Sequence, residues 1–276
     1  MGNLADDMVV KGADGRYQAE LSADWDFWGP NGGYVAALGL RAVQAHSALP
    51  RLASMSTHFL SGARHGHVDI DVTTLRTSRR AESIRVSMSQ EGRPVCESLV
   101  WMVATDLVGL VHDHVRRPDL PGHEQLLSII DLVGPDMEPP MPIFRNIEWK
   151  PFAWQHPGVP DPAAAEARWS AWWRFLPQAT FDDAFVDAAR AVILLDLNTW
   201  AAGSKGRPYE ISYLAPTIDL SIQFHQAQPD SEWLLVDGMA DIADEGLVSG
   251  QSRLWSSDGT LIASAFSTLL CREIRS

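Results

Sequence analysis

The strongest constraint on the fold is a stretch near the N-terminus that is apolar almost all round. Residues Tyr34 to Val43 have helical propensity and carry one charged side chain, Arg41. A helix that is apolar on every side belongs inside a core rather than on a surface. It follows the turn Asn31-Gly32-Gly33 and stops before Pro50. Other elements of the chain must therefore enclose it.

Strand-like segments surround this helix in the sequence. Their apolar residues alternate with polar ones, as in strands with one buried face. One precedes the helix and four follow it, at Arg16 to Leu21, Ser54 to Leu60, Val68 to Thr77, Ser83 to Gln90 and Pro94 to Val103. An antiparallel sheet with one apolar helix has a simple solution, in which the sheet curls around the helix.

The second half of the chain repeats this order of elements. Asp187 to Asp196 predicts a second apolar helix, and the turn Gln90 to Pro94 matches Ser257 to Leu261. A similar offset pairs Phe59 with Phe224, which indicates a tandem duplication. The predicted strands of this half are Ile147 to Trp154, Ala167 to Leu176, Thr217 to Phe224, Trp233 to Met239, Gly246 to Trp255 and Leu261 to Cys271.

We therefore predict an α+β fold of two antiparallel sheets, each wrapped around a central apolar helix. The units span residues 1–105 and 143–276, and a proline-rich connection spans 106–142, with a short helix at Glu124 to Leu132. Sheets of this kind have edges that usually pair, so the duplication supplies a pseudo-dimer within one chain. We also expect a homodimer of the whole chain.

Composition excludes several classes of protein. The 276 residues carry a net charge of −13, which argues against nucleic acid as a partner. No apolar run approaches ~20 residues and no signal peptide is evident, so we expect a soluble cytoplasmic protein without a membrane contact. Cys96 and Cys271 are far apart and their apolar neighbours favour buried thiols.

Cofactor and metal sites are not predicted either. The chain has no glycine-rich dinucleotide or phosphate loop and no Gly-x-Ser-x-Gly motif. His65-Gly66-His67 and His112-Asp113-His114 have a spacing known from metal sites, but neither has a clear third ligand. We expect no cofactor and no bound metal.

The ordered set of motifs resembles the acyl-CoA thioesterases of type II, which have a double hotdog fold. In the first half the resemblance rests on Gly32-Gly33, Thr57-His58-Phe59-Leu60 and Thr74-Leu75-Arg76. In the second half it rests on Leu195-Asp196-Leu197-Asn198, Thr217-Ile218-Asp219, Phe224-His225, Glu232-Trp233-Leu234-Leu235 and Asp258 to Ser264. Members of this family hydrolyse acyl-CoA thioesters with an activated water and without a covalent nucleophile.

The resemblance also implies a catalytic set, typically an Asp, a Thr and a Gln of the second half. The Asp position matches Asp219, which also interrupts the apolar pattern of its strand. Counting without gaps, Asp241 occupies the usual Thr position and Ser267 the usual Gln position. Asp219 is then the expected base, near the seam between the halves and within reach of Asp241 or Ser267. Each of the three also has a purely structural interpretation, as a strand-end or surface residue.

Two substrate-binding elements are predicted. Gly32 and Gly33 precede a helix whose first N–H groups favour an oxyanion, although a tight turn and close packing also explain these glycines. The positively charged group Arg76, Arg79 and Arg80 is a candidate for the phosphates of coenzyme A, or only a solvated hairpin end.

The leading functional prediction is hydrolysis of an acyl thioester, with acyl-CoA as the expected substrate. A first alternative is another acyl-thioester enzyme on the same fold, such as a hydratase, a dehydratase or an acyl-transfer enzyme. A second is a non-catalytic protein that binds an acyl ligand. The eleven tryptophans either line an acyl tunnel or fill a core.

Overall fold

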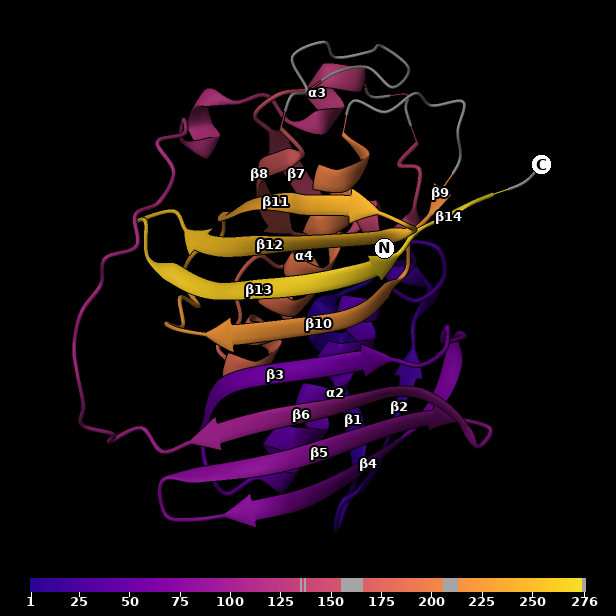
Figure 1. The fold of residues 1–276 in the computed structure, drawn as a ribbon, viewed down its shortest axis with the longest axis vertical. Coiled ribbons are helices and arrows are strands. Elements are labelled where there is room, and N and C mark those ends of the chain that lie inside the picture. The colour runs from indigo at the N-terminus through magenta and orange to yellow at the C-terminus, as the bar shows by residue number, and fades with distance from the viewer. Residues whose placement is uncertain (135, 137, 155–165, 206–212, 275–276) are drawn as a thin grey trace.

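A single antiparallel sheet of 12 strands dominates the structure, a computed structural model (Figure 1). It describes residues 1–134, 136, 138–154, 166–205 and 213–274. The strand order is β1-β2-β4-β5-β6-β3-β10-β13-β12-β11-β8-β7, so the first six strands of the chain form one side of the sheet and the later strands the other. The two long helices, α2 and α4, lie against one face of the sheet.

The first half of the sheet contains the predicted elements close to their predicted bounds. It is built from α1 (Leu4–Asp7), β1 (Val10–Ala13), β2 (Arg16–Leu21), η1 (Ala23–Trp25), α2 (Gly32–His46), β3 (Arg51–Phe59), β4 (Gly66–Thr77), β5 (Ala81–Gln90) and β6 (Arg93–Val103). The strand β1 and the short helices α1 and η1 were not predicted, because the alternation of apolar and polar residues does not indicate them.

The connection contains short elements only. They are η2 (His123–Gln125), α3 (Ile129–Val133) and η3 (Pro142–Arg145). The predicted helix from Glu124 to Leu132 is confirmed only from Ile129 on, because Leu126 and Ser128 adopt extended backbone and Ser128 caps α3.

The second half of the sheet follows the predicted order of elements. It contains β7 (Ile147–Pro151), β8 (Arg168–Phe175), α4 (Ala184–Ser204), β9 (Tyr213–Leu214), β10 (Thr217–Phe224), β11 (Leu234–Asp244), β12 (Leu247–Ser256), β13 (Leu261–Leu270) and β14 (Arg272–Glu273). Helix α4 extends well beyond the predicted Asp187 to Asp196, since buried residues continue on both sides of that segment. None of the described helices is both long enough and apolar enough to cross a bilayer.

The prediction of two separate sheets is wrong, because β3 and β10 join the halves. These strands lie side by side in the middle of Figure 1 and pair antiparallel from His58–Asp219 to Ser54–Gln223. At the centre of the pair the hydroxyl groups of Ser56 and Ser221 are hydrogen-bonded at 3.0 Å. Two edge strands present unpaired N–H and C=O groups, and pairing them removes both edges. The result is one continuous sheet.

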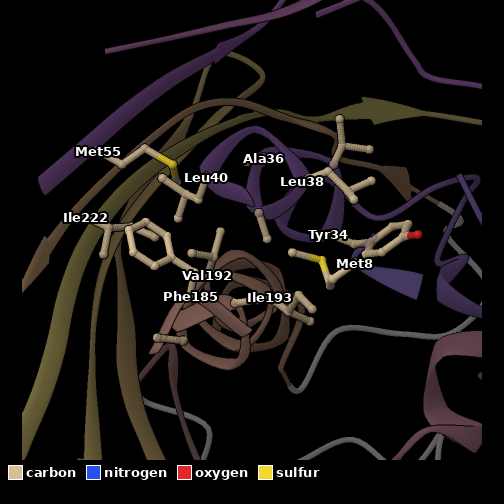
Figure 2. Close-up of a cluster of buried hydrophobic side chains, with 14 of the residues drawn as sticks. Met8, Tyr34, Ala36, Leu38, Leu40, Met55, Phe185, Val192, Ile193 and Ile222 are labelled. Atoms are coloured by element: carbon tan, nitrogen blue, oxygen red, sulfur yellow. The ribbon is translucent and has the colours of Figure 1, made fainter. Parts of the chain in front are cut away.

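The core lies between the concave face of this sheet and the two helices. Figure 2 shows Leu40 of α2 and Val192 of α4 packed between the helices and the strands, with Met55 of β3 and Ile222 of β10 on the sheet side. All four are at most 2% exposed. Both halves therefore contribute to one hydrophobic cluster, which explains why each helix is apolar nearly all round.

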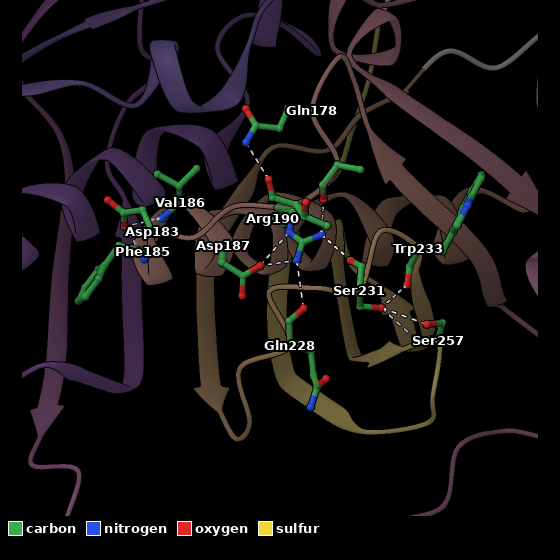
Figure 3. A network of polar contacts seen from close by, with 12 residues as sticks. Gln178, Asp183, Phe185, Val186, Asp187, Arg190, Gln228, Ser231, Trp233 and Ser257 are labelled. Carbon is green, nitrogen blue, oxygen red and sulfur yellow. Dashed lines mark hydrogen bonds and ion pairs between the residues drawn. The ribbon is translucent and has the colours of Figure 1, made fainter.

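A buried arginine fastens the start of α4 to the loops around it (Figure 3). Arg190 is 1% exposed, and its guanidinium donates hydrogen bonds to Asp187 and to the backbone oxygens of Ala179, Ser231 and Gln228. These oxygens belong to the loop before α4 and to the loop between β10 and β11. Because a buried charge is tolerated only when it is paired and hydrogen-bonded, this network fixes the position of the helix.

We predict that Arg190→Met lowers the free energy of unfolding by about 3–5 kcal/mol, because it leaves the Asp187 carboxylate buried without its partner. Urea denaturation at pH 7 measures this loss. The control is Arg145→Met, which removes a half-exposed arginine that lies 3.9 Å from Glu138 and should cost at most about 1 kcal/mol. Equal losses in the two variants would contradict a role for the buried network.

Candidate active site

A cavity of about 310 Å³ lies where the two halves meet. Its walls are formed by the start of α2, the middle of α4, the end of β3, the start of β10 and the loops before α2 and after β3. Its lining residues are Phe27, Trp28, Gly29, Pro30, Asn31, Gly32, Val35, Phe59, Leu60, Ser61, Gly62, Ala63, Val95, Asp196, Leu197, Trp200, Ala215, Pro216, Thr217, Ile218 and Leu269. The walls are mainly apolar, and Asp196 is the one charged residue among them.

Asp196 accepts three hydrogen bonds, and two of them join it to the first half of the chain. Its Oδ2 accepts the backbone N–H of Gly33 and the side-chain N–H of Asn31, each at 2.9 Å. Its Oδ1 accepts the hydroxyl of Thr217 at 2.8 Å. The carboxylate thus comes from α4, its first partners from the start of α2, and its third from the first residue of β10.

Burial raises the pKa of Asp196 above the ordinary aspartate value, although the hydrogen bonds from Thr217, Gly33 and Asn31 oppose the shift. The residue is 6% exposed. A carboxylate with a raised pKa is a stronger base than an aspartate in water. Its position in the wall of a cavity makes Asp196 the best candidate for proton transfer in the described residues.

The first turn of α2 uses its N–H groups in an ordered way. The N–H of Gly33 bonds Asp196, that of Tyr34 bonds the side chain of Asn31, and that of Val35 bonds the backbone oxygen of Asn31. The one N–H group of this turn without a hydrogen-bond partner among the described residues is that of Gly32, a residue of the cavity wall. Of the two predicted oxyanion donors, Gly33 therefore holds the carboxylate, and Gly32 is the one available to a ligand.

Gly33 also sets the distance between the helices. A Cβ atom at this position would lie 2.7 Å from the Cα of Ile193 and from the backbone oxygen of Val192. Any other residue would push α2 away from α4. The Gly33 N–H would then move away from the Asp196 carboxylate that it bonds. Gly33 therefore allows close packing of the helices and donates a hydrogen bond to Asp196 at the same contact.

Asp219 lies on the other face of the sheet. Its neighbours in β10, Leu220 and Ile222, are fully buried against the helices, and side chains alternate along a strand. The Asp219 carboxylate is 37% exposed and lies 3.4 Å from the imidazole of His58 on β3. It is near the seam as predicted, but it faces away from Gly32 and Gly33. A bulge between Thr217 and Asp219 separates the orientations of these two residues.

Asp241 and Ser267 do not complete a site with Asp219. Asp241 is exposed on β11 and accepts a hydrogen bond from Gln251 at 3.2 Å. Ser267 is buried on the helix side of β13, where its hydroxyl pairs with that of Thr199 on α4 at 2.6 Å. The prediction that Asp219 reaches either residue is therefore wrong, since the three lie in different environments on two faces of the sheet.

The predicted arginine group is at the wrong end of the sheet for this cavity. Phe59, the last residue of β3, lines the cavity, whereas Arg51 begins that strand at the opposite end. Arg51 pairs with Val103, and Val103 with Ala81. Arg76, Arg79 and Arg80 therefore lie with Ala81 at the end of the sheet away from the cavity.

Most tryptophans between Trp149 and Trp173 pack on one another rather than on the cavity. Trp149 stacks on Trp173 with ring centroids 5.5 Å apart and also meets Trp154 and Trp169. The cavity contains a different pair, Trp28 and Trp200, whose centroids are 5.6 Å apart. These two form its aromatic wall.

The predicted histidine motifs have other partners. His65 lies 2.7 Å from Asp26, His67 lies near Glu20 and Asp69, and His112 stacks on His114. Within the described residues, no three His, Cys, Asp or Glu side chains are grouped so that they could hold a metal ion. Of the two cysteines, Cys96 is fully buried, which raises the pKa of its thiol to about 12, and Cys271 is half-buried.

Sequence reasoning missed Asp196, Thr217 and Asn31 as site residues, although a signal was present. Asp196 follows Val192-Ile193-Leu194-Leu195 in a helix that is otherwise apolar on this side. A charged residue that interrupts a buried helix is as informative as one that interrupts a strand. The same criterion, applied to strands, selected Asp219. It failed there because the bulge that turns Asp219 to the outer face leaves no clear mark in the sequence.

Solved structures with the same fold cover nearly the whole chain. A hotdog-fold protein of unknown function from Alicyclobacillus acidocaldarius has a TM-score of 0.81 and 19% identity, covering 99% of this chain and 98% of its own. A putative thioesterase II from Thermobifida fusca has a TM-score of 0.79 and 18% identity, covering 100% and 98%. The acyl-CoA thioesterase II TesB2 from Mycobacterium marinum has a TM-score of 0.78 and 18% identity, covering 99% of both chains.

No curated protein matches the sequence. Two family models do match it, and together they include every wall of the cavity. The acyl-CoA thioesterase N-terminal domain matches residues 21–103, and the acyl-CoA thioesterase C-terminal domain matches residues 114–270. Because these two models match most of the chain and its fold is that of solved hotdog proteins, the chain belongs to the acyl-CoA thioesterase family.

Proposed function

We propose that the protein hydrolyses an acyl-CoA thioester with a water molecule activated by Asp196. The observation that carries this proposal is the position of the Asp196 carboxylate, whose pKa is raised, in the wall of a mainly apolar cavity. Thr217, Asn31 and Gly33 hold the carboxylate in place, so that it needs no reorganisation before it accepts a proton.

The geometry supports a direct attack by water. The Asp196 carboxylate takes a proton from water while the water oxygen attacks the thioester carbonyl. The negative charge that develops on the carbonyl oxygen is stabilised by the N–H of Gly32 at the positive end of α2. The C–S bond then breaks, and the proton held by Asp196 passes to the leaving thiolate. The products are the carboxylic acid and the free thiol.

The apolar wall indicates where the acyl chain lies. Val35, Phe59, Leu197 and Trp200 surround the polar centre on the two helices and β3. Burying an acyl chain against them is favourable by roughly 0.8 kcal/mol for each CH₂. Binding in this wall would set the carbonyl beside Asp196.

We predict that Asp196→Asn lowers kcat for acyl-CoA hydrolysis by roughly 10²-fold or more, because it removes the base and nearly conserves the shape. Release of free thiol from a panel of acyl-CoAs measures the rate, and circular dichroism checks the fold. The matched control is Asp219→Asn on the other face of the sheet, which should change kcat by less than about twofold.

The opposite result, with Asp219→Asn inactive and Asp196→Asn active, would restore Asp219 as the base. Two other functions have distinct outcomes in the same assay. Acyl-CoA binding by the wild-type protein without release of thiol would favour a non-catalytic binding protein. Conversion of acyl-CoA without release of thiol would favour a hydratase or dehydratase on this fold.

The pKa of Asp196 also predicts the pH dependence. Because the base must be ionised, kcat/KM should fall on acidification with a midpoint above the ordinary aspartate value of about 3.9. Folded Asp196 holds its proton more tightly than the unfolded chain does, so its contribution to stability is lost as pH rises from about 4 through the folded pKa. Urea denaturation should therefore show Asp196→Asn gaining stability relative to wild type as the pH rises above about 4. A relative loss over that range would contradict a raised pKa.

We also propose two hotdog units at residues 1–105 and 143–276, a cytoplasmic location and a role in lipid metabolism. The two family matches and the pairing of β3 with β10 support the division. A homodimer would cover Leu99 and Phe266, which are 50% and 56% exposed and pair with Ser56 and Ser221 at the centre of the sheet. Such a face is self-complementary, since the two halves present equivalent residues about the centre.

Light scattering should therefore give twice the chain mass of 30.4 kDa for the wild-type protein. Leu99→Lys with Phe266→Lys should give the mass of one chain, because like charges would then face each other across the interface. A monomeric wild-type protein at high concentration would contradict the dimer.

A further inference from the structure

We propose that Arg64 and Arg93 bind a phosphate group of the substrate's pantetheine-bearing carrier at the mouth of the cavity. The inference rests on the proposed function and assigns the part of the substrate that lies outside the acyl pocket. Both arginines lie beside the loop from Leu60 to Ala63, which forms one wall of the cavity. Both are exposed.

The loop that carries Arg64 is held rigidly. The side chain of Gln90 accepts the backbone N–H of Arg64 at 2.8 Å and donates to the backbone oxygens of Arg64 and His67, at 2.8 Å and 2.9 Å. The N–H groups of Leu60 and Ser61 both bond the backbone oxygen of Val95. Because the loop is fixed at this many points, the backbone that carries Arg64 needs no ordering when a ligand binds, which lowers the entropic cost of binding.

Arg93 is anchored and yet keeps donors available. One terminal N–H of its guanidinium bonds the backbone oxygen of Gly62, in the cavity wall. A guanidinium has five N–H donors in a planar fork that suits phosphate. His65, which follows Arg64 in the chain, has a carboxylate partner already, because it lies 2.7 Å from Asp26.

Neither arginine is neutralised by an acidic side chain. Among the described residues, the arginines in ion pairs within 4.0 Å are Arg41, Arg145, Arg168, Arg174 and Arg190. These two cations lie beside the loop that lines the cavity, in a chain with a net charge of −13. Their local field would attract a phosphate that the rest of the surface repels.

The chemistry of the substrate fits this placement. In a coenzyme A thioester the pantetheine arm separates the thioester from the phosphates. With the carbonyl at Asp196 inside the cavity, the phosphates must therefore lie outside it, towards the mouth. The phosphate attached directly to pantetheine also occurs in acyl carrier proteins, so the substrates of the test must distinguish the two carriers.

The test compares Arg64→Gln/Arg93→Gln with Arg79→Gln/Arg80→Gln, which removes the same charge at the far end of the sheet. Titration calorimetry with free coenzyme A measures binding without hydrolysis. We expect the first variant to weaken binding by about tenfold, a typical loss for charge-assisted hydrogen bonds, and the second to leave it within about twofold. Equal weakening in both, or weakening only in the far-end variant, would overturn the proposal.

Hydrolysis assays then identify the phosphate. KM should rise by about tenfold for acyl-CoA in Arg64→Gln/Arg93→Gln and stay unchanged for the acyl thioester of pantetheine, which has no phosphate, while kcat is retained for both. An equal rise with the acyl thioester of 4′-phosphopantetheine assigns the contact to the phosphate common to both carriers. A rise with acyl-CoA alone assigns it to the nucleotide phosphates. Equal effects on all three substrates would mean that the arginines only hold the loop, and would overturn the proposal.

These two measurements separate failure of the inference from failure of the proposed function. Wild-type protein that binds coenzyme A through Arg64 and Arg93 but releases no thiol from any substrate would refute hydrolysis and leave the phosphate site standing. Hydrolysis with no preference for phosphate-bearing substrates would retain the proposed function and refute the phosphate site.

Discussion

The contact between the first turn of α2 and the middle of α4 is the interaction on which the rest of the structure depends. Gly33 allows the two backbones to approach, and its N–H bonds the Asp196 carboxylate across the interface. The same contact aligns the halves of the sheet, because each helix is enclosed by its own half. A polar site and a packing contact are therefore one feature, and a change in either would disturb the other.

The two halves use equivalent positions in opposite ways. Asn31 caps α2 and donates to Asp196, whereas Asp183 caps α4 and accepts a bond from Gln44 at 3.3 Å. Asp196 and Gln44 lie equally far along their helices from the caps at Asp183 and Asn31. The amide and the carboxylate have thus exchanged places between the two pseudo-equivalent contacts.

This exchange accounts for one candidate site in a duplicated chain. Arg41 pairs with Asp183 at 2.6 Å. Although burial pushes the pKa of Asp183 upward, the N–H of Phe185 and the guanidinium of Arg41 hold it below the ordinary value. A carboxylate with a lowered pKa, already paired with a cation, is a weak base. Asp196 has neutral partners only, so the effect of burial prevails and its pKa is raised.

The sequence by itself determined the two long helices, the main strands and their order. Apolar residues on every side of Tyr34 to Val43 require a buried helix, and the alternation in Val68 to Thr77 requires a half-buried strand, because both patterns depend on the chain's local geometry. The matching turns and the matching Phe59 and Phe224 made the duplication visible for the same reason. The family resemblance followed from that order.

Only the tertiary structure decided which residues meet. Asn31 and Asp196 are far apart in the sequence and hydrogen-bonded in the fold, because their contact depends on how two helices cross. A bulge at the start of β10 turned Thr217 to Asp196 and left Asp219 on the outer face. Pairing of β3 with β10 placed the ends of these strands at one cavity and Arg79 and Arg80 at the other end. No local sequence pattern encodes the distance between two helices, a bulge or the pairing of distant edge strands, so only the fold defines the site.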